Sequence, residues 1–138
     1  QYAALLNKTI TIQATSDENF TMLRITPLLA IINNLMSNAI EAIAQQGTII
    51  LHVHSEHEYT YFTVTDDGSG MSAETIGIIF EPGYTTKFNA EGVAATGIGL
   101  SHVQQILERL EGTIDVQSTP GHTQFVVKVK TIYIKKEG

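Results

Sequence analysis

The sequence predicts an α+β sandwich, in which a sheet built largely from hairpins is covered by helices. Alternating apolar and polar runs occur in two close pairs, and a short turn-like segment separates the members of each pair. Segments with helical spacing of apolar residues lie between these pairs and do not follow every strand. This order favours an α+β sandwich over a parallel, doubly wound sheet.

The first half of the chain is expected to contain a strand, a helix and a hairpin. Residues 8–13 alternate and are β-prone, so they predict a first strand. Thr26 offers a capping hydroxyl and Pro27 suits the first helical position, so a helix begins there, and Gly47 is expected to end it. Residues 48–54 and 59–65 alternate on either side of a short polar segment, which predicts an antiparallel hairpin.

The second half is expected to hold two helices, a long loop and a second hairpin. Ser72 can cap a short helix that reaches about Ile79. Residues 81–97 have no clear period, and a loop of this length in a compact domain is usually functional or mobile. A helix is predicted from about Ile98 to Leu110, with residues 113–118 and 123–130 forming the last hairpin.

The composition indicates one water-soluble globular domain. The 138 residues are enough to bury a full core, and no apolar run approaches the ~20 residues that span a bilayer, so we expect no membrane contact by this domain. The net charge is −6 without a basic patch, which argues against nucleic acid as a partner. The absence of cysteine excludes disulfides and thiolate chemistry, and is compatible with the cytoplasm.

Asn34, Asn38 and Glu41 lie at helical spacing within an otherwise apolar segment. In a helix this spacing brings two carboxamides and a carboxylate to one face. Magnesium prefers oxygen ligands and is often held by one or two protein oxygens together with phosphates. We therefore expect Asn38 to coordinate Mg²⁺, with Asn34 and Glu41 beside it. The alternative is a solvated face, which the apolar flanks disfavour.

The segment D-D-G-S-G-M follows directly on a predicted strand, and its glycines allow the backbone to turn close to a ligand. Asp66 is an acceptor, so in an apolar pocket it can accept from the exocyclic amine of adenine and would reject guanine. Gly68, Gly70 and Met71 are expected to line the same pocket. The alternative is an ordinary Asp-Gly turn after a strand.

Two further motifs follow in the long loop. Phe80 either covers a bound base or packs the loop onto the core, and Thr85, Thr86 and Lys87 are expected to reach phosphates, with Lys87 the one cation in the middle of the chain. The run A-T-G-I-G-L precedes a predicted helix, where backbone N–H groups suit phosphates, although the glycine pair alone is a weak signal. Its expected contacts are Thr96, Gly97, Ile98, Gly99 and Leu100.

In this order, the motifs resemble those of the ATP-binding catalytic domain of bacterial sensor histidine kinases. That domain belongs to the GHKL group, together with gyrase-type, MutL-type and heat-shock chaperone ATPases. The asparagine box is similar to residues 34–39, the D-x-G-x-G box to 66–70, the phenylalanine box to 80–87 and the second glycine box to 96–100. The segments N-A-I-E-A and F-E-P-G-Y-T-T-K look most like those of the citrate/dicarboxylate or glutamine-sensing kind of kinase.

The resemblance implies a Bergerat-type, two-layer sandwich with a mixed, mostly antiparallel sheet. ATP would lie between the asparagine helix and residues 83–96. Asp66 would bind the adenine amine, Asn38 would hold Mg²⁺, and Gly97 and Gly99 would anchor the loop at the phosphates. Residues 8–138 would be the catalytic domain, and residues 1–7 the tail of a helix that carries the acceptor histidine.

ATPases of this group carry a glutamate that activates water where this chain has Asn34, an amide that cannot act as a base. The resemblance therefore implies phosphoryl transfer rather than hydrolysis, with Asn34 and Lys87 as the catalytic residues. The expected partners are ATP, a dimerisation domain with the acceptor histidine, and a response regulator, in a cytoplasmic location. Two alternatives stay open: a serine kinase of the anti-sigma-factor type, and a nucleotide-binding regulatory module without transfer.

Overall fold

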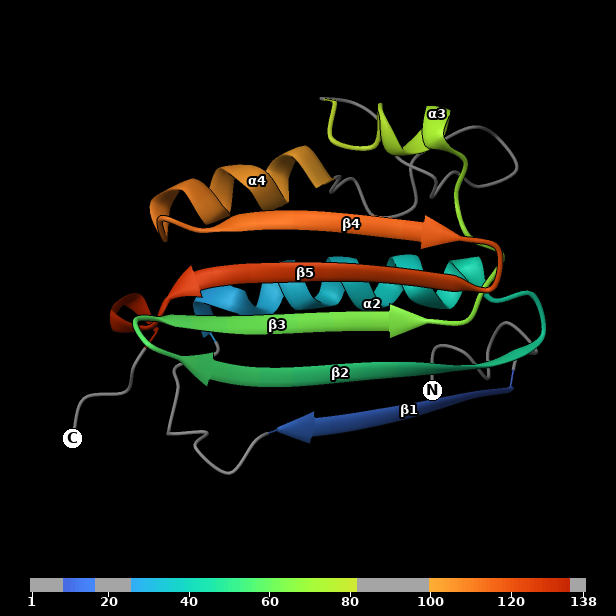
Figure 1. Ribbon diagram of the computed structural model, residues 1–138, viewed down its shortest axis with the longest axis horizontal. Coiled ribbons are helices and arrows are strands. Elements are labelled where there is room, and N and C mark those ends of the chain that lie inside the picture. Colours follow the sequence, from blue (N-terminus) through green and yellow to red (C-terminus); the bar gives the residue numbers. More distant parts are fainter. Residues whose placement is uncertain (1–8, 17–25, 82–99, 135–138) are drawn as a thin grey trace.

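Five strands form a single sheet, and its elements follow one another in the predicted order (Figure 1). The computed structural model describes residues 9–16, 26–81 and 100–134. The elements are β1 (Thr9–Ser16), η1 (Thr26–Leu28), α2 (Leu29–Ala42), β2 (Gln46–Glu56), β3 (Tyr59–Asp66), α3 (Ala73–Ile76), α4 (Leu100–Arg109), β4 (Thr113–Thr119), β5 (His122–Lys130) and η2 (Thr131–Tyr133).

The strand order in the sheet is β1-β2-β3-β5-β4. β1 pairs with β2 in parallel, and the other three pairings are antiparallel. The parallel pair requires a crossover connection, and α2 lies within it. The predicted hairpins β2–β3 and β4–β5 are confirmed, and so is the mixed, mostly antiparallel sheet.

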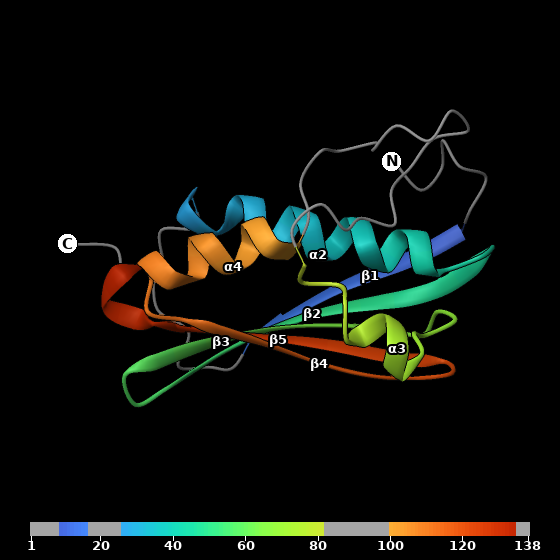
Figure 2. The ribbon, with the colours of Figure 1, turned by 90° about the horizontal axis from the view of Figure 1, so that it is seen from above.

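The helices α2 and α4 lie on the same side of the sheet (Figure 2). Every second residue of β3 is buried, which places one face of the strand in the core and ends with Asp66 on that face. On α2 the apolar side chains recur at helical spacing and are buried. The buried apolar core comprises Leu28, Ile31, Leu35, Ala39, Ile40, Ile43, Ile49, Phe62, Val64, Ile79, Leu100, Val103, Leu107, Leu110, Phe125, Val127, Val129 and Ile134.

The asparagine helix begins at the predicted position, although with a 3₁₀ turn, whereas its predicted C-terminal end is wrong. The α-helix ends at Ala42, and Ile43 already has an extended backbone. Gly47 lies inside β2, where an added Cβ would stand 2.5 Å from Oδ1 of Asp67, so this glycine permits a close approach and does not end a helix. At the other end, Thr26 begins a 3₁₀ turn, and the residue that caps α2 is Leu28, without a side-chain hydrogen bond.

The remaining elements differ from the expectation mainly in length. Ser72 caps α3 as predicted, because its hydroxyl accepts a hydrogen bond from the N–H of Thr75 at 3.1 Å, but the helix ends at Ile76. β1 continues to Ser16, beyond the predicted strand. At the end of α4 the N–H of Gly112 donates to the carbonyl of Leu107 at 2.8 Å. Among the described residues, no helix combines the length and the apolar character needed to cross a bilayer.

Candidate functional site

The polar face of α2 is assembled as its spacing predicts. Asn34 is buried, with 5% of its surface exposed, and Asn38 and Glu41 are half-buried. The side-chain amide of Asn38 donates to Oδ1 of Asn34 at 3.2 Å. Burial of Asn34 shows that this is not simply a solvated helix face, since buried amides are retained where they have polar partners.

Asp66 is the last residue of β3 and is buried, with 4% of its surface exposed. Its Oδ1 accepts a hydrogen bond from the N–H of Gly68 at 2.8 Å. Burial raises the pKa of Asp66 above the ordinary value of 3.8; the Gly68 hydrogen bond opposes this rise, and the neighbouring charge of Asp67 adds to it. A carboxylate whose ionised form is disfavoured by burial is typical of functional sites.

The loop after β3 is bonded to the end of α2. The N–H of Ser69 donates to the carbonyl of Ala42 at 3.1 Å, and a Cβ on Gly68 would lie 2.5 Å from the same carbonyl oxygen. Ala42 is in the last turn of the helix that carries Asn38 and Glu41. The structure therefore brings together the asparagine helix and the Asp66 loop, two motifs that are separate in the sequence.

The other side of this loop rests on the β4–β5 hairpin (Figure 1). Gly70 has a positive φ of 84°, and a Cβ there would lie 2.5 Å from the carbonyl oxygen of Thr119, so both conformation and space require glycine. The N–H of Met71 donates to Oγ of Ser118 at 2.8 Å, and Ser118 Oγ lies 2.7 Å from Oγ1 of Thr123.

The start of β2 also holds the loop. The N–H of Thr48 donates to Oδ1 of Asp67 at 2.9 Å, so the second aspartate of the motif is bound to the backbone of β2. Asp67 is exposed whereas Asp66 is buried, although the two are adjacent in the chain. The strand alternation separates them: Asp66 faces the helix layer and Asp67 ties the turn to the sheet.

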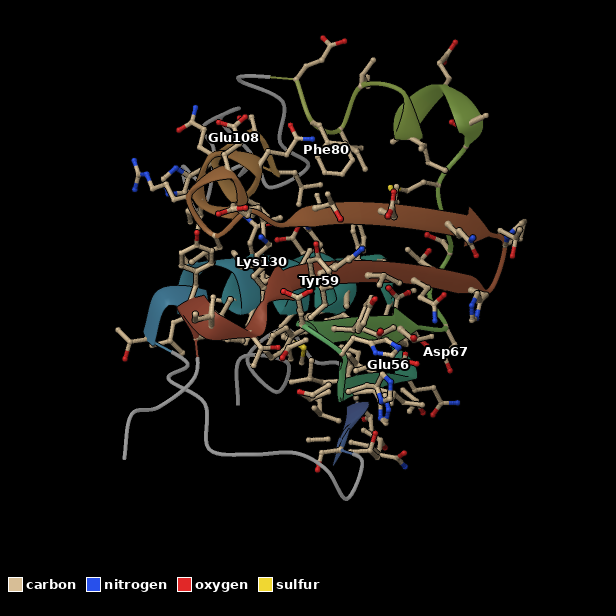
Figure 3. All side chains as sticks on the ribbon, turned by 60° about the vertical axis from the view of Figure 1, so that its left-hand side comes forward. Glu56, Tyr59, Asp67, Phe80, Glu108 and Lys130 are labelled. Carbon is tan, nitrogen blue, oxygen red and sulfur yellow. The ribbon has the colours of Figure 1, made fainter. Side chains whose placement is uncertain are left out.

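Phe80 is half-buried and packs against the apolar core. In Figure 3 it lies on the other side of β4 from Asp67. Met71 is also half-buried against the core, and Leu100 is buried at the first residue of α4. The predicted contacts Thr85, Thr86, Lys87, Thr96, Gly97, Ile98 and Gly99 lie outside the described residues.

Sequence reasoning missed Ser118 and Thr123, the two hydroxyls beneath the loop. Thr123 is buried, with 3% of its surface exposed, and its register partner on β3 is Asp66. The strand alternation contains a signal for it, because Thr123 shares the inward face of β5 with Phe125 and Val127. A polar residue in such a position needs a partner. No local pattern indicates Ser118, whose partner Met71 is far away in the sequence.

Comparisons with known proteins agree with the architecture and with the family that the motifs resemble. The family model described as "Histidine kinase-, DNA gyrase B-, and HSP90-like ATPase" matches residues 24–132. The sensor histidine kinase GlnK of Bacillus subtilis (strain 168) is 32% identical over 139 residues, which cover 100% of this chain and 34% of GlnK. The sensor histidine kinase DcuS of Escherichia coli (strain K12) is 37% identical over 109 residues, covering 77% of this chain and 19% of DcuS.

Among solved structures, the nucleotide-free catalytic domain of the histidine kinase ThkA superposes with a TM-score of 0.75 at 23% sequence identity. The match covers 94% of this chain and 83% of the ThkA chain, and it shows the shared fold. This chain spans about a third of GlnK and about a fifth of DcuS. The family model covers most of the chain, and the chain belongs to the family of histidine kinase-, DNA gyrase B- and HSP90-like ATPases.

Proposed function

We propose that this chain is the catalytic domain of a two-component sensor histidine kinase. It binds Mg-ATP and transfers the γ-phosphoryl group to a histidine on a dimerisation domain. The observation that carries the proposal is the bonded contact between the Asp66 loop and the last turn of the asparagine helix, within a chain of this ATPase family. This contact supports an adenine-binding wall and a phosphate-binding wall in one pocket.

Adenine recognition is assigned to Asp66. Its carboxylate is buried and has one oxygen held by the Gly68 amide, so its orientation is fixed before a ligand arrives. An ionised carboxylate only accepts hydrogen bonds, which suits the exocyclic amine of adenine; the carbonyl of guanine would leave two acceptors facing each other. Gly68, Gly70 and Met71 form the backbone beside it, and the two glycines let this backbone lie close against Ala42 and Thr119.

Magnesium binding is assigned to Asn38. Its amide nitrogen donates a hydrogen bond to Asn34, and in this orientation the side-chain oxygen is the atom that would bind the cation. Mg²⁺ prefers oxygen ligands of this type. The ion would neutralise phosphate charge, and Glu41, one turn further along α2, is suited to hold water beside it. Asn34 offers an amide and no base, which favours transfer to a positioned acceptor over activation of water.

The phosphate side of the pocket is assigned by resemblance to the loop between α3 and α4. Thr85, Thr86 and Lys87 would contact the phosphates, with Lys87 supplying positive charge. Thr96, Gly97, Ile98, Gly99 and Leu100 would bring the N-terminal end of α4 to the phosphates. Leu100 is the one member of this group within the described residues, and its buried position anchors the start of α4 in the core.

The partners and the location follow from the same proposal. GlnK and DcuS are sensor histidine kinases, and ThkA has been solved in complex with the response regulator TrrA. We accordingly assign this chain a dimerisation domain with an acceptor histidine, a cognate response regulator downstream, and a cytoplasmic location. Residues 8–138 form the catalytic domain, and residues 1–7 belong to the end of the acceptor helix.

The proposal is tested by phosphoryl transfer. The chain is incubated with Mg²⁺ and γ-labelled ATP and a separately supplied dimerisation domain, with an acceptor-histidine-to-alanine version as the control. We expect acid-labile label on the parent dimerisation domain only. ATP binding without transfer would favour a regulatory module, and acid-stable label on serine would favour a kinase of the anti-sigma-factor type.

A further inference from the structure

We propose that Ser118, on β4, is a positioning residue of the nucleotide site. This inference rests on the proposed function, because it concerns how the adenine-binding loop is held. Ser118 is the second-last residue of β4, just before the β4–β5 turn, and it is half-buried. Its hydroxyl connects the loop that follows Asp66 to the strand that lies beside Asp66.

The hydroxyl of Ser118 takes part in two short hydrogen bonds. It accepts from the N–H of Met71 at 2.8 Å, and its oxygen lies 2.7 Å from Oγ1 of Thr123. A serine hydroxyl has one donor and two acceptor positions, so it satisfies both neighbours at once. Alanine at this position would leave the Met71 amide and the buried Thr123 hydroxyl without this partner.

Both neighbours of Ser118 belong to the site. Met71 follows Gly70, whose backbone is packed against Thr119, so the loop lies directly on the end of β4. Thr123 is the β5 register partner of Asp66 and is buried beside it. The hydroxyl of Ser118 therefore fixes the position of the loop relative to the sheet through Met71. It also fixes the side chain of Thr123, which lies next to the proposed adenine-binding carboxylate of Asp66.

A matched pair at the other end of the sheet separates this role from ordinary sheet stability. Ser55 Oγ and Thr60 Oγ1 lie 3.0 Å apart across the β2–β3 hairpin, with the same sequence separation as Ser118 and Thr123. Thr60 is fully buried, and its other hydroxyl contact is Thr131 at 2.7 Å. The Ser55 pair thus bonds to a 3₁₀ turn, whereas the Ser118 pair bonds to the loop of the site.

The test compares variants of Ser118 that differ in the hydroxyl group. Ser118→Thr keeps the hydroxyl. Ser118→Val gives a side chain of nearly the same shape as threonine but without the hydroxyl. ATP and GTP dissociation constants are measured with Mg²⁺, and the unfolding temperature is measured without nucleotide. We expect Ser118→Val and Ser118→Ala to bind ATP about 3- to 10-fold more weakly, the effect of one or two hydrogen bonds, and to discriminate less against GTP. Ser118→Thr should restore both values.

Ser55→Ala is the control, and it should lower the unfolding temperature while leaving ATP affinity and the ATP-to-GTP ratio unchanged. The proposal is overturned if Ser118→Val binds ATP with the parent affinity and selectivity, or if Ser55→Ala reduces both as much as Ser118→Ala does. In either case the parent still binds ATP and the proposed function stands. A parent chain that fails to bind Mg-ATP would instead overturn the proposed function and this inference with it.

Discussion

Asp66 and Glu111 lie at opposite ends of the sheet, and their surroundings shift their pKa values in opposite directions. Asp66 is buried at the end of β3, and burial raises its pKa. Glu111 is exposed after α4; it accepts a hydrogen bond from the Tyr133 hydroxyl and forms an ion pair with Lys130 at 3.1 Å. The Tyr133 hydrogen bond, followed by the Lys130 contact, lowers the pKa of Glu111.

The difference teaches how the two ends divide their roles. At the Glu111 end, polar groups are exposed or bonded to one another, and they fasten α4 and β5 to the last 3₁₀ turn. At the Asp66 end, a carboxylate is held in a buried position where its charged form is disfavoured. Natural proteins retain such local conflicts mainly at functional sites. Four sets of substitutions test this division, from the largest expected effect to the smallest.

Gly68→Ala should have the largest effect, because it acts on stability and on the site together. The new Cβ would stand 2.5 Å from the Ala42 carbonyl oxygen and must push the loop away from α2. We expect about 1–3 kcal/mol of destabilisation, measured by urea unfolding. ATP affinity, measured by calorimetry below the unfolding transition, should fall by at least about 100-fold because Asp66 moves with the loop.

Gly112→Ala is the matched control at the Glu111 end. Its Cβ would also lie 2.5 Å from a backbone carbonyl oxygen, that of Lys128. It should destabilise the fold by a similar amount, about 1–3 kcal/mol, without a comparable loss of ATP affinity in the folded protein. Equal losses of affinity in the two variants would contradict a division between the two ends.

Asp66→Asn should separate binding from stability. Loss of the charged acceptor is expected to weaken ATP binding by about 10- to 100-fold, while asparagine still accepts from Gly68. Because burial raises the pKa of Asp66, the ionised carboxylate destabilises the fold at pH above that raised pKa, and the cost disappears as pH falls towards 3.8. The variant should therefore be at least as stable as the parent at pH 7, with an advantage that shrinks towards pH 3.8. A variant clearly less stable at pH 7 would refute this.

Asn38→Ala should remove the proposed metal ligand and little else. The affinity of the parent for ATP should rise when Mg²⁺ is added. In the variant we expect this rise to be smaller by a factor of about ten, which corresponds to about 1.4 kcal/mol of binding free energy. Asn33→Ala is the control, since Asn33 is the exposed neighbour of Asn34 on the same helix. Titrations of ATP with and without Mg²⁺ measure the difference, and an unchanged Mg²⁺ dependence in Asn38→Ala would remove Asn38 from the metal site.

Glu111→Gln should have the smallest effect, with a pH dependence opposite to that of Asp66. A lowered pKa means that the ionised carboxylate stabilises the fold above the ordinary value of 4.5, and that this contribution is lost as pH falls through the lowered pKa. Thermal unfolding should show a slight loss at pH 7 that vanishes in acid and decreases with salt, because the pair is exposed. ATP affinity should not change, and a loss of affinity would link the two ends of the sheet.

Local patterns predicted most of the fold, because strands, hairpins and the Ser72 cap depend on neighbouring residues. The alternation in β3 placed Asp66 at the end of an inward-facing row, and the helical spacing brought Asn34 and Asn38 together. The order of the elements also sufficed for the fold class. Gly47 misled the prediction, since a glycine after an apolar helix usually ends it, whereas here it makes room for the distant Asp67 side chain.

The parts of the site that escaped prediction depend on contacts between distant segments. Ala42 supplies a backbone carbonyl to the Ser69 amide, and any residue type would offer the same group. Ser118 is one of several serines and threonines in a strand, and only the register of β4 on β5 and the path of the loop single it out. Neither the Ala42–Ser69 contact nor the position of Ser118 beneath the loop can be predicted from a local sequence pattern.

The parallel pairing of β1 has a consequence for the order of folding. The β2–β3 and β4–β5 hairpins join neighbouring segments, so they can close at low entropic cost. β1 meets β2 with Thr9 opposite Gln46, and this register forms only after the chain has passed through α2. We infer that β1 attaches late and is released early, so its amides should exchange with solvent sooner than those of β3, the strand that carries Asp66.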